Sequence, residues 1–191
     1  MSAVVDIARN TYLSVRGRPS PGRPYLKQTM RGYTDVVREA AFFKDGRRAV
    51  TGSDDRTLQI WDVQKGVLAA GPFEGHTNRV RSVTVSPDDN LIASGGYDKT
   101  IIIWDVERQQ KVFDPLVKHT DWVRSVCFSY DGKRLASGSN DKTVVIWDVG
   151  TGAVLATLEG HGNWVLSVAF GWAKISLRVN GPYYPGLADR A

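Results

Sequence analysis

Two sets of Asp, His and Ser residues could carry out catalysis. In each set a Ser lies 18 residues after the His and an Asp lies 22 residues after it, namely His76, Ser94 and Asp98, and His119, Ser137 and Asp141. These are the residue types of a hydrolytic triad, in which an imidazole takes the proton of a seryl hydroxyl and a carboxylate orients the imidazole. A catalytic set is needed once per site, whereas this one recurs. We therefore expect a structural role, with a hydrolase as the alternative.

The recurrence belongs to a longer internal repeat. The dipeptide Trp-Asp occurs three times at steps of 43 residues, beginning at Trp61, Trp104 and Trp147, and the neighbouring residues repeat in register. A fixed period of this length indicates copies of one supersecondary unit, each covering the apolar face of its neighbour. Apolar and β-branched runs alternate with turn residues, which predicts four strands per unit. In the first unit we expect strands over 36–42, 48–53, 57–62 and 67–73.

The repeated residues resemble those of the WD-repeat family of β-propellers, whose units carry Gly-His near the start and Trp-Asp at the end. Gly75-His76 precedes the second Trp-Asp pair, Lys118-His119 precedes the third, and Gly160-His161 opens a further unit. The resemblance implies an all-β fold, namely a partial, open WD-repeat β-propeller of three four-stranded antiparallel blades plus a fragment of a fourth. We expect this propeller segment over 24–170, with units near 32–74, 75–117, 118–159 and 160–170.

Both ends of the chain depart from the repeat. Residues 1–23 are basic and rich in Pro and Gly, so we expect a flexible tail. The period breaks down after residue 170, and we interpret 171–191 as the divergent C-terminal tail of a truncated family member. Propellers close with about four to eight blades, so these units predict an open array with exposed apolar faces. We favour a fragment that needs a partner over self-association of two copies to complete the ring.

The resemblance also implies a role for the repeated polar residues. In the family, the His, a Ser or Thr hydroxyl, the turn Asp and the Trp of each unit form a hydrogen-bonded chain. The matching residues are His76, Ser94, Asp98 and Trp104 in the second unit, His119, Ser137, Asp141 and Trp147 in the third, and Thr51, Asp55 and Trp61 in the first. Such bonding fits the need of a buried carboxylate for partners. Tyr33 replaces the first His, so we expect a looser network there.

Variable residues at the start of each first strand face one rim of the ring in the family. Arg is present at the same position of three successive units, and guanidinium groups suit carboxylate or phosphate. We hypothesise a binding face for an acidic or phosphorylated peptide or protein, formed by Arg38, Arg79, Arg81, Tyr97, Trp122, Arg124 and Trp164. The alternative is that these arginines pair with Asp35 or Asp121 and only fix loops.

Charge and cysteine content restrict the other function classes. The first 48 residues hold ten Lys or Arg against four Asp or Glu, so the net charge of +5 comes from the N-terminal stretch. Nucleic-acid binding is therefore not indicated for the repeats, and a basic tail that binds nucleic acid is the alternative. Cys127 is the only cysteine, and the three His belong to separate units, so we expect no metal and no cofactor.

The sequence has no secretory apolar segment after Met1 and no run of about 20 apolar residues. We expect an intracellular protein, cytoplasmic or nuclear, with no membrane partner. Together these features predict a non-catalytic scaffold for protein–protein interaction.

Overall fold

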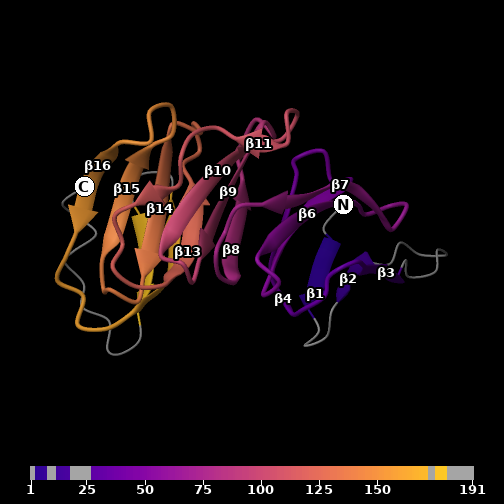
Figure 1. Cartoon of the computed structure of the whole chain (residues 1–191), viewed down its shortest axis with the longest axis horizontal. Coiled ribbons are helices and arrows are strands. Elements are labelled where there is room, and N and C mark those ends of the chain that lie inside the picture. Colours follow the sequence, from indigo (N-terminus) through magenta and orange to yellow (C-terminus); the bar gives the residue numbers. More distant parts are fainter. Residues whose placement is uncertain (1–2, 8–11, 18–26, 172–174, 180–191) are drawn as a thin grey trace.

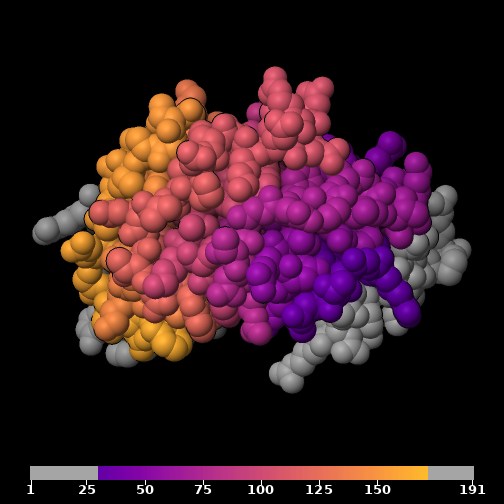
Figure 2. Space-filling model, in the orientation of Figure 1, coloured from indigo at the N-terminus to yellow at the C-terminus, as the bar shows by residue number. Residues whose placement is uncertain are grey.

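The computed structural model describes residues 3–7, 12–17, 27–171 and 175–179, and within these ranges it is all-β with no helix. The strands form antiparallel sheets that follow one another along the chain (Figure 1). The first strands of successive units, β4, β8, β13 and β17, lie side by side, each in contact with the next. In Figure 2 the units form successive bands of colour, so each unit contacts its sequence neighbours. The expected all-β, open arrangement of blades is confirmed.

The first unit is a four-stranded sheet of consecutive strands. Its members are β4 (Val37–Phe42), β5 (Arg48–Ser53), β6 (Thr57–Asp62) and β7 (Val67–Glu74). The third unit repeats the arrangement with β13 (Val123–Phe128), β14 (Arg134–Ser139), β15 (Val144–Asp148) and β16 (Val154–Leu158). The turns between the first two strands contain a residue with positive φ, supplied by Gly46 at 65° and Gly132 at 70°. Glycine adopts that conformation without steric cost, which is why these hairpins reverse there.

The second unit differs from the other two at its outer edge. Strands β8 (Val80–Val85), β9 (Leu91–Gly96) and β10 (Thr100–Asp105) follow the common pattern. The fourth strand is divided into β11 (Gln110–Lys111) and β12 (Leu116–Val117), and both segments pair with β10. Pro115 lies between them, and proline cannot donate a backbone hydrogen bond to a sheet. The division is therefore confined to the periphery of the array.

Strands also form in both stretches that we expected to be tails. At the N-terminal end β1 (Ala3–Ile7), β2 (Tyr12–Gly17) and β3 (Lys27–Arg31) make a three-stranded sheet in which β2 is central. At the other end β17 (Val165–Phe170) pairs with β18 (Ile175–Val179). The expectation of a flexible tail over 1–23 therefore differs from the structure at 3–7 and 12–17. Those segments carry β-branched and aromatic residues, which favour strands, and precede most of the Pro and Gly residues.

Apolar contacts between neighbouring sheets form the core. One cluster joins Leu58 and Ile60 of the first unit to Ile92, Ile102 and Trp104 of the second. A second cluster joins the second unit to the third, and a third joins the third unit to β17. The tryptophans Trp61, Trp104 and Trp147 are each 2% exposed. Each sheet therefore buries one face on the preceding sheet, as the repeat predicts.

Hydrogen bonds also join successive first strands at one position of the repeat. The backbone N–H of Val126 donates to Ser82 Oγ at 3.1 Å, and that of Val168 donates to Ser125 Oγ at 3.2 Å. In the first unit Glu39 takes the place of the serine and accepts from the N–H of Val83 at 2.9 Å. Side chains on the first strands thus connect each unit to the next.

Candidate functional site

The second unit contains a continuous chain of buried polar groups. His76 Nδ1 lies 2.8 Å from Asp98 Oδ2, and His76 Nε2 lies 2.8 Å from Ser94 Oγ. Trp104 Nε1 donates to the same hydroxyl oxygen at 2.9 Å. Since an ionised carboxylate only accepts, Nδ1 carries the imidazole proton and Nε2 accepts from the serine. The chain connects the loop before β8 to β9, to the turn after β9 and to β10.

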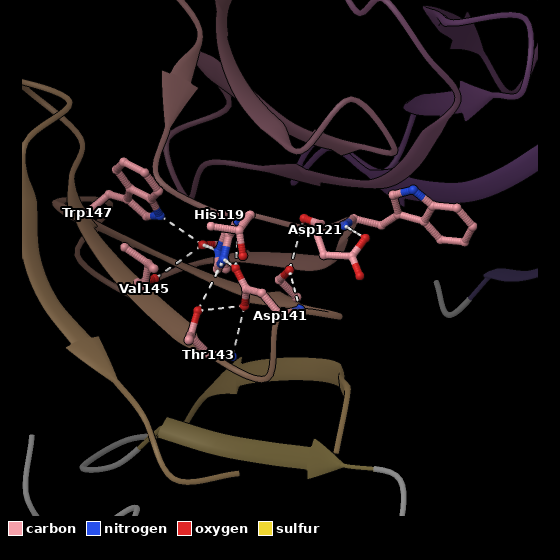
Figure 3. A network of polar contacts seen from close by, with 10 residues as sticks. His119, Asp121, Asp141, Thr143, Val145 and Trp147 are labelled. Atoms are coloured by element: carbon pink, nitrogen blue, oxygen red, sulfur yellow. Dashed lines mark hydrogen bonds and ion pairs between the residues drawn. The ribbon is translucent and has the colours of Figure 1, made fainter. Parts of the chain in front are cut away.

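The third unit repeats this arrangement (Figure 3). His119 lies between Asp141, at 2.8 Å from Nδ1, and Ser137, at 2.7 Å from Nε2. Trp147 Nε1 donates to Ser137 Oγ at 2.8 Å. The carboxylate of Asp141 also accepts from the backbone N–H and the hydroxyl of Thr143, at 2.9 and 2.7 Å. Two units separated by 43 residues therefore hold the same four groups in nearly the same geometry.

The carboxylates of these chains are stabilised in their ionised form. Burial alone would raise the pKa of Asp98, but hydrogen bonding and the nearby His76 ring outweigh burial and lower it. The pKa of Asp141 is lowered in the same way, against the effect of burial, by His119 and Thr143. Protonation of either carboxylate would break bonds that the folded chain uses. Acid therefore acts against these networks.

The Asp, His and Ser contacts match those of a hydrolytic triad, but the serine hydroxyl is not accessible to a substrate as a nucleophile must be. Ser94 and Ser137 are 0% exposed, and each hydroxyl oxygen already accepts from the indole of its unit. A seryl nucleophile must reach a substrate carbonyl, which these hydroxyls cannot do beneath a buried tryptophan. The geometry supports a structural role for both sets.

Tyr33 divides the network of the first unit into two parts. Its hydroxyl contacts Thr51 Oγ1 and donates to the carbonyl oxygen of Thr51 at 2.7 Å, while Trp61 Nε1 donates to the Thr51 hydroxyl at 2.8 Å. Asp55 instead accepts from Thr57 and, at 3.3 Å, from the backbone N–H of Thr34. Burial raises the pKa of Tyr33, so the phenol stays neutral. The carboxylate is thereby separated from the hydroxyl and the indole.

His161 begins the fourth unit without the partners of its equivalents. Its Nε2 atom is buried and has no hydrogen-bond partner among the described residues. Burial lowers the pKa of this imidazole, which therefore favours the neutral form. In β18 the residue paired with Val168 is Leu177, at the register position where Ser94 pairs with Val83 and Ser137 with Val126, and leucine has no hydroxyl.

The rim at the start of each first strand is fixed by the backbone. The N–H of Asp54 donates to the carbonyl of Val36 at 2.8 Å, and the same bond joins equivalent residues of the second unit, Tyr97 and Arg79, at 2.9 Å. In the third unit the N–H of Asn140 donates to the carbonyl of Trp122 at 3.0 Å. These bonds hold the turn after the second strand against the entry to the first strand. The side chains on this rim therefore project from a rigid frame.

Asp54 pairs with one arginine of the first unit and one of the second. Arg38 Nε donates to Asp54 Oδ1 at 2.6 Å, and an Nη of Arg38 contacts the other carboxylate oxygen. Arg79 Nη1 lies 3.7 Å from the same carboxylate. The expected partners Asp35 and Asp121 instead accept from the backbone N–H of the next residue, each at 2.7 Å. Arg38 and Arg79 are therefore paired within the chain, but with neither carboxylate of the alternative.

The other aromatic and arginine candidates gather around Arg124. The rings of Tyr97 and Trp122 stack with centroids 4.1 Å apart and planes 5° from parallel. The Arg124 guanidinium carbon lies 5.3 Å from the Trp122 ring centroid, 5.5 Å from that of Trp164 and 5.6 Å from that of Tyr97. We call these four residues the Arg124 cluster. Its side chains come from the second, third and fourth units, so only the stacked array brings them together.

Arg81 is the remaining rim candidate, and its charge acts on the half-buried carboxyl group of Glu39. Burial raises the pKa of Glu39, and the charge of Arg81 partly offsets that effect. Sequence reasoning alone does not place Glu39 at a site, because its role depends on contact with β8, 44 residues further along. The sequence does contain one indication of this role: Glu39 stands at a repeat position that is Ser in the next two units.

Two other kinds of feature are absent from the described ranges. No group of three or more His, Cys, Asp or Glu residues there is arranged to hold a metal ion. The same ranges contain no helix that is long and apolar enough to cross a membrane.

Comparison with known proteins gives matches over the repeats. The family described as "WD domain, G-beta repeat" matches residues 24–62, 69–105 and 110–148. A stretch of 39 residues is 49% identical to the vegetative incompatibility protein HET-E-1 of Podospora anserina, and covers 20% of this chain and 3% of that protein. A stretch of 48 residues is 38% identical to the small ribosomal subunit protein RACK1 of Dictyostelium discoideum, and covers 25% of this chain and 14% of that protein. The matched stretches are therefore a small part of either relative.

Proposed function

Because the chain belongs to the WD domain, G-beta repeat family, whose repeats generally serve as protein-interaction scaffolds, we propose that it is a non-catalytic scaffold that binds a peptide or protein through one rim. The partner-binding residues in this proposal are Arg38, Arg79, Arg81, Tyr97, Trp122, Arg124 and Trp164. The partner segment is acidic or phosphorylated. The buried His, hydroxyl, Asp and Trp groups hold the units that carry this rim.

The observation that supports the proposal most directly is the composition of the exposed rim. Trp122 is 37% exposed and Trp164 is 43% exposed, and both lie against the Arg124 guanidinium. Tryptophan, tyrosine and arginine are the residue types enriched in interface hot spots. Large aromatic side chains that stay partly in water at a rigid rim are suited to being covered by a partner.

A double substitution tests the role of the rim. Arg81→Ala with Arg124→Ala should weaken binding of an acidic protein partner by several kcal/mol, roughly the 2–5 kcal/mol typical of buried interfacial charges. Partners would be captured by a photo-crosslinking residue placed at the exposed neighbouring position 163, and their affinities for the original chain, the double variant and the control would be measured by calorimetry. The matched control is Lys65→Ala with Arg108→Ala, which removes the same charge from the turns at the opposite ends of the strands. Equal affinity of all three chains would refute the proposal.

Self-association is a second part of the proposal on partners. Strand β18 has, among the described strands, β17 as its paired neighbour, and an open strand edge can pair with another chain. Size-exclusion chromatography with light scattering should then give a mass that rises with concentration. A monomer mass throughout would exclude it. We place these interactions inside the cell, in keeping with the lone Cys127.

A further inference from the structure

Equivalent rim positions in the first and third units hold their arginine in the same way but differ in charge. Arg38 Nε donates to Asp54 Oδ1 at 2.6 Å, and Arg124 Nε donates to Asn140 Oδ1 at 2.7 Å. Asp54 and Asn140 are 7% and 6% exposed, so both acceptors are buried parts of the frame. Asp54 cancels the charge of its arginine, whereas an amide orients Arg124 and leaves its charge in place.

The Nη atoms of Arg124 make only weak hydrogen bonds within the described part of the chain. One Nη lies 3.4 Å from the Tyr97 hydroxyl, which is a long hydrogen bond. No carboxylate oxygen in the described part of the chain lies within 4.0 Å of this guanidinium. Arginine has five N–H donors, so most of the fork is available to an acceptor from outside. The aromatic rings beside it limit access of water and so strengthen such a bond.

We propose that the Arg124 cluster is a subsite for one anionic side chain of a peptide, a carboxylate or a phosphate, whose neighbouring apolar residue packs on Trp164 and Trp122. This rests on the proposed scaffold function and names the chemistry of its ligand. Asn140 is a positioning residue, because it sets the plane of the fork through Nε. The stacked rings of Tyr97 and Trp122 and the ring of Trp164 all lie beside the fork.

A single anionic group fits this rim better than a nucleic-acid backbone does. A polyanion is held by a series of cations that follow the phosphates. Along this rim Arg38 and Arg79 share the carboxylate of Asp54, which cancels part of their charge. The guanidinium groups therefore do not form a continuous positive track.

Four pools of fluorescein-labelled octapeptides would test the proposal on the full chain. All pools share randomised flanking residues and a fixed central pair X-Leu, with Glu, phosphoserine, Gln or Lys as X. The Glu and phosphoserine pools should bind at least about tenfold more tightly than the Gln pool, which is the typical value of a hydrogen bond to a charged group. Comparison of Glu with phosphoserine identifies which anion the subsite takes.

Asn140→Asp is the decisive variant, because it places in the third unit the carboxylate that Asp54 supplies in the first. In this variant the acidic pools should bind about as tightly as the Gln pool, and the affinity for the Gln pool itself should not change. Arg124→Gln should do the same. Asp54→Asn should increase the preference, because it frees Arg38. The control Arg108→Gln lies at the opposite ends of the strands and should leave the preference unchanged.

Three results would overturn the proposal. They are equal binding of acidic and Gln pools by the unmodified chain, an acidic preference that survives both Asn140→Asp and Arg124→Gln, and tighter binding of octauridine RNA than of any peptide pool. Circular dichroism shows whether each variant is folded. If Asn140→Asp is unfolded, the result for Arg124→Gln alone tests the proposal. If the peptide-pool test fails but Arg81→Ala with Arg124→Ala still weakens binding of captured proteins, the subsite is refuted and the scaffold function is retained.

Discussion

At the scale of single residues, one hydroxyl is the centre of each complete network. Ser94 Oγ and Ser137 Oγ each accept from an indole N–H and lie within hydrogen-bond distance of an imidazole nitrogen. A buried donor or acceptor that loses its partner costs more than the bond itself contributed. The hydroxyl is therefore more important to stability than its size suggests.

Removal of one hydroxyl should show this cost. Ser137→Ala leaves the Trp147 indole N–H and the His119 Nε2 atom without their partner, so we expect a loss of about 2 kcal/mol in the free energy of unfolding. Thr151→Ala is the control, because its hydroxyl is exposed in a turn and its removal should cost under about 0.5 kcal/mol. Urea denaturation followed by tryptophan fluorescence measures both. Similar losses in the two variants would contradict the account.

Glu39 makes stability depend on pH in the direction opposite to the network aspartates. Burial raises its pKa, so the folded state favours the protonated acid. Its contribution is fully present below the pKa of an unfolded glutamate, about 4.3, and is lost as the pH rises through the higher folded value. For Asp98 and Asp141, whose pKa values are lowered, stability is present above about 3.9 and is lost as the pH falls.

Glu39→Ser isolates this effect, because serine occupies the position in the next two units. The free energy of unfolding of the variant, minus that of the original chain, should be larger at pH 7 than at pH 4. The reason is that the variant lacks a carboxyl group whose ionisation opposes folding. Urea denaturation of both chains at the two pH values gives the difference. The network aspartates are present in both chains and cancel. A difference that does not change with pH would show that Glu39 ionises without cost.

The sequence was sufficient to identify the residues of the network but not the partners of the arginines. Copies in register indicate which His, Ser, Asp and Trp belong together. Arg38 and Asp54, by contrast, meet only through the pairing of β4 with β5. The nearer candidates Asp35 and Asp121 cap the next backbone N–H, a local bond that needs no pairing of strands.

At the scale of elements, close packing depends on a glycine in the second strand of each unit. A Cβ atom on Gly95 would lie 2.5 Å from Val123 Cγ1, and one on Gly138 would lie 2.6 Å from Val165 Cγ1. The valines belong to the first strand of the following unit. Glycine at this position lets adjacent sheets approach.

A methyl group at this position should separate two sheets. Gly95→Ala should lower the free energy of unfolding by about 1–3 kcal/mol, the usual cost of overpacking. Val123→Ala removes the nearest methyl, so the double variant should lose less than the two single variants added together. Gly150→Ala, where the nearest atom would lie at 3.5 Å, is the control. Simple additivity, measured by urea denaturation, would exclude contact as the cause.

Strand positions inside the repeats could be predicted closely, while the irregular parts could not. The expected strands 48–53 and 57–62 agree with β5 and β6. The division of the fourth strand into β11 and β12 was missed, because a period shows where a unit recurs and not where one copy departs from it. Strands β1 and β2 lie in a stretch where charge and proline predict a tail, but their β-branched residues favour strand pairing.

At the scale of the whole molecule, the units form a linear series in which contacts join sequence neighbours. The inner strands contact in the order β4, β8, β13 and β17, and the apolar clusters each join adjacent sheets. In such an array stability is approximately the sum of unit and interface contributions. A local defect should therefore have a local effect.

Hydrogen exchange measures how far a defect extends. Ser137→Ala should lower amide protection in β13–β16 and in the adjoining β17, and should leave β4–β7 close to the original values, because those strands have no direct contact with the third network. Mass spectrometry of exchanged peptides resolves these segments. A uniform decrease along the chain would show that the units unfold as one cooperative body.

At the rim positions 54, 97 and 140 the backbone hydrogen bond is common to the three units, whereas the side chain differs from unit to unit. At each of them the architecture uses the backbone N–H, which donates to the carbonyl of residue 36, 79 or 122. The side chains there are an acid, a phenol and an amide, and the backbone bond is the same in all three. Exchange of these three side-chain types among the three sites should therefore keep the fold and change specificity, so that a single base change from Asn to Asp redirects recognition during evolution.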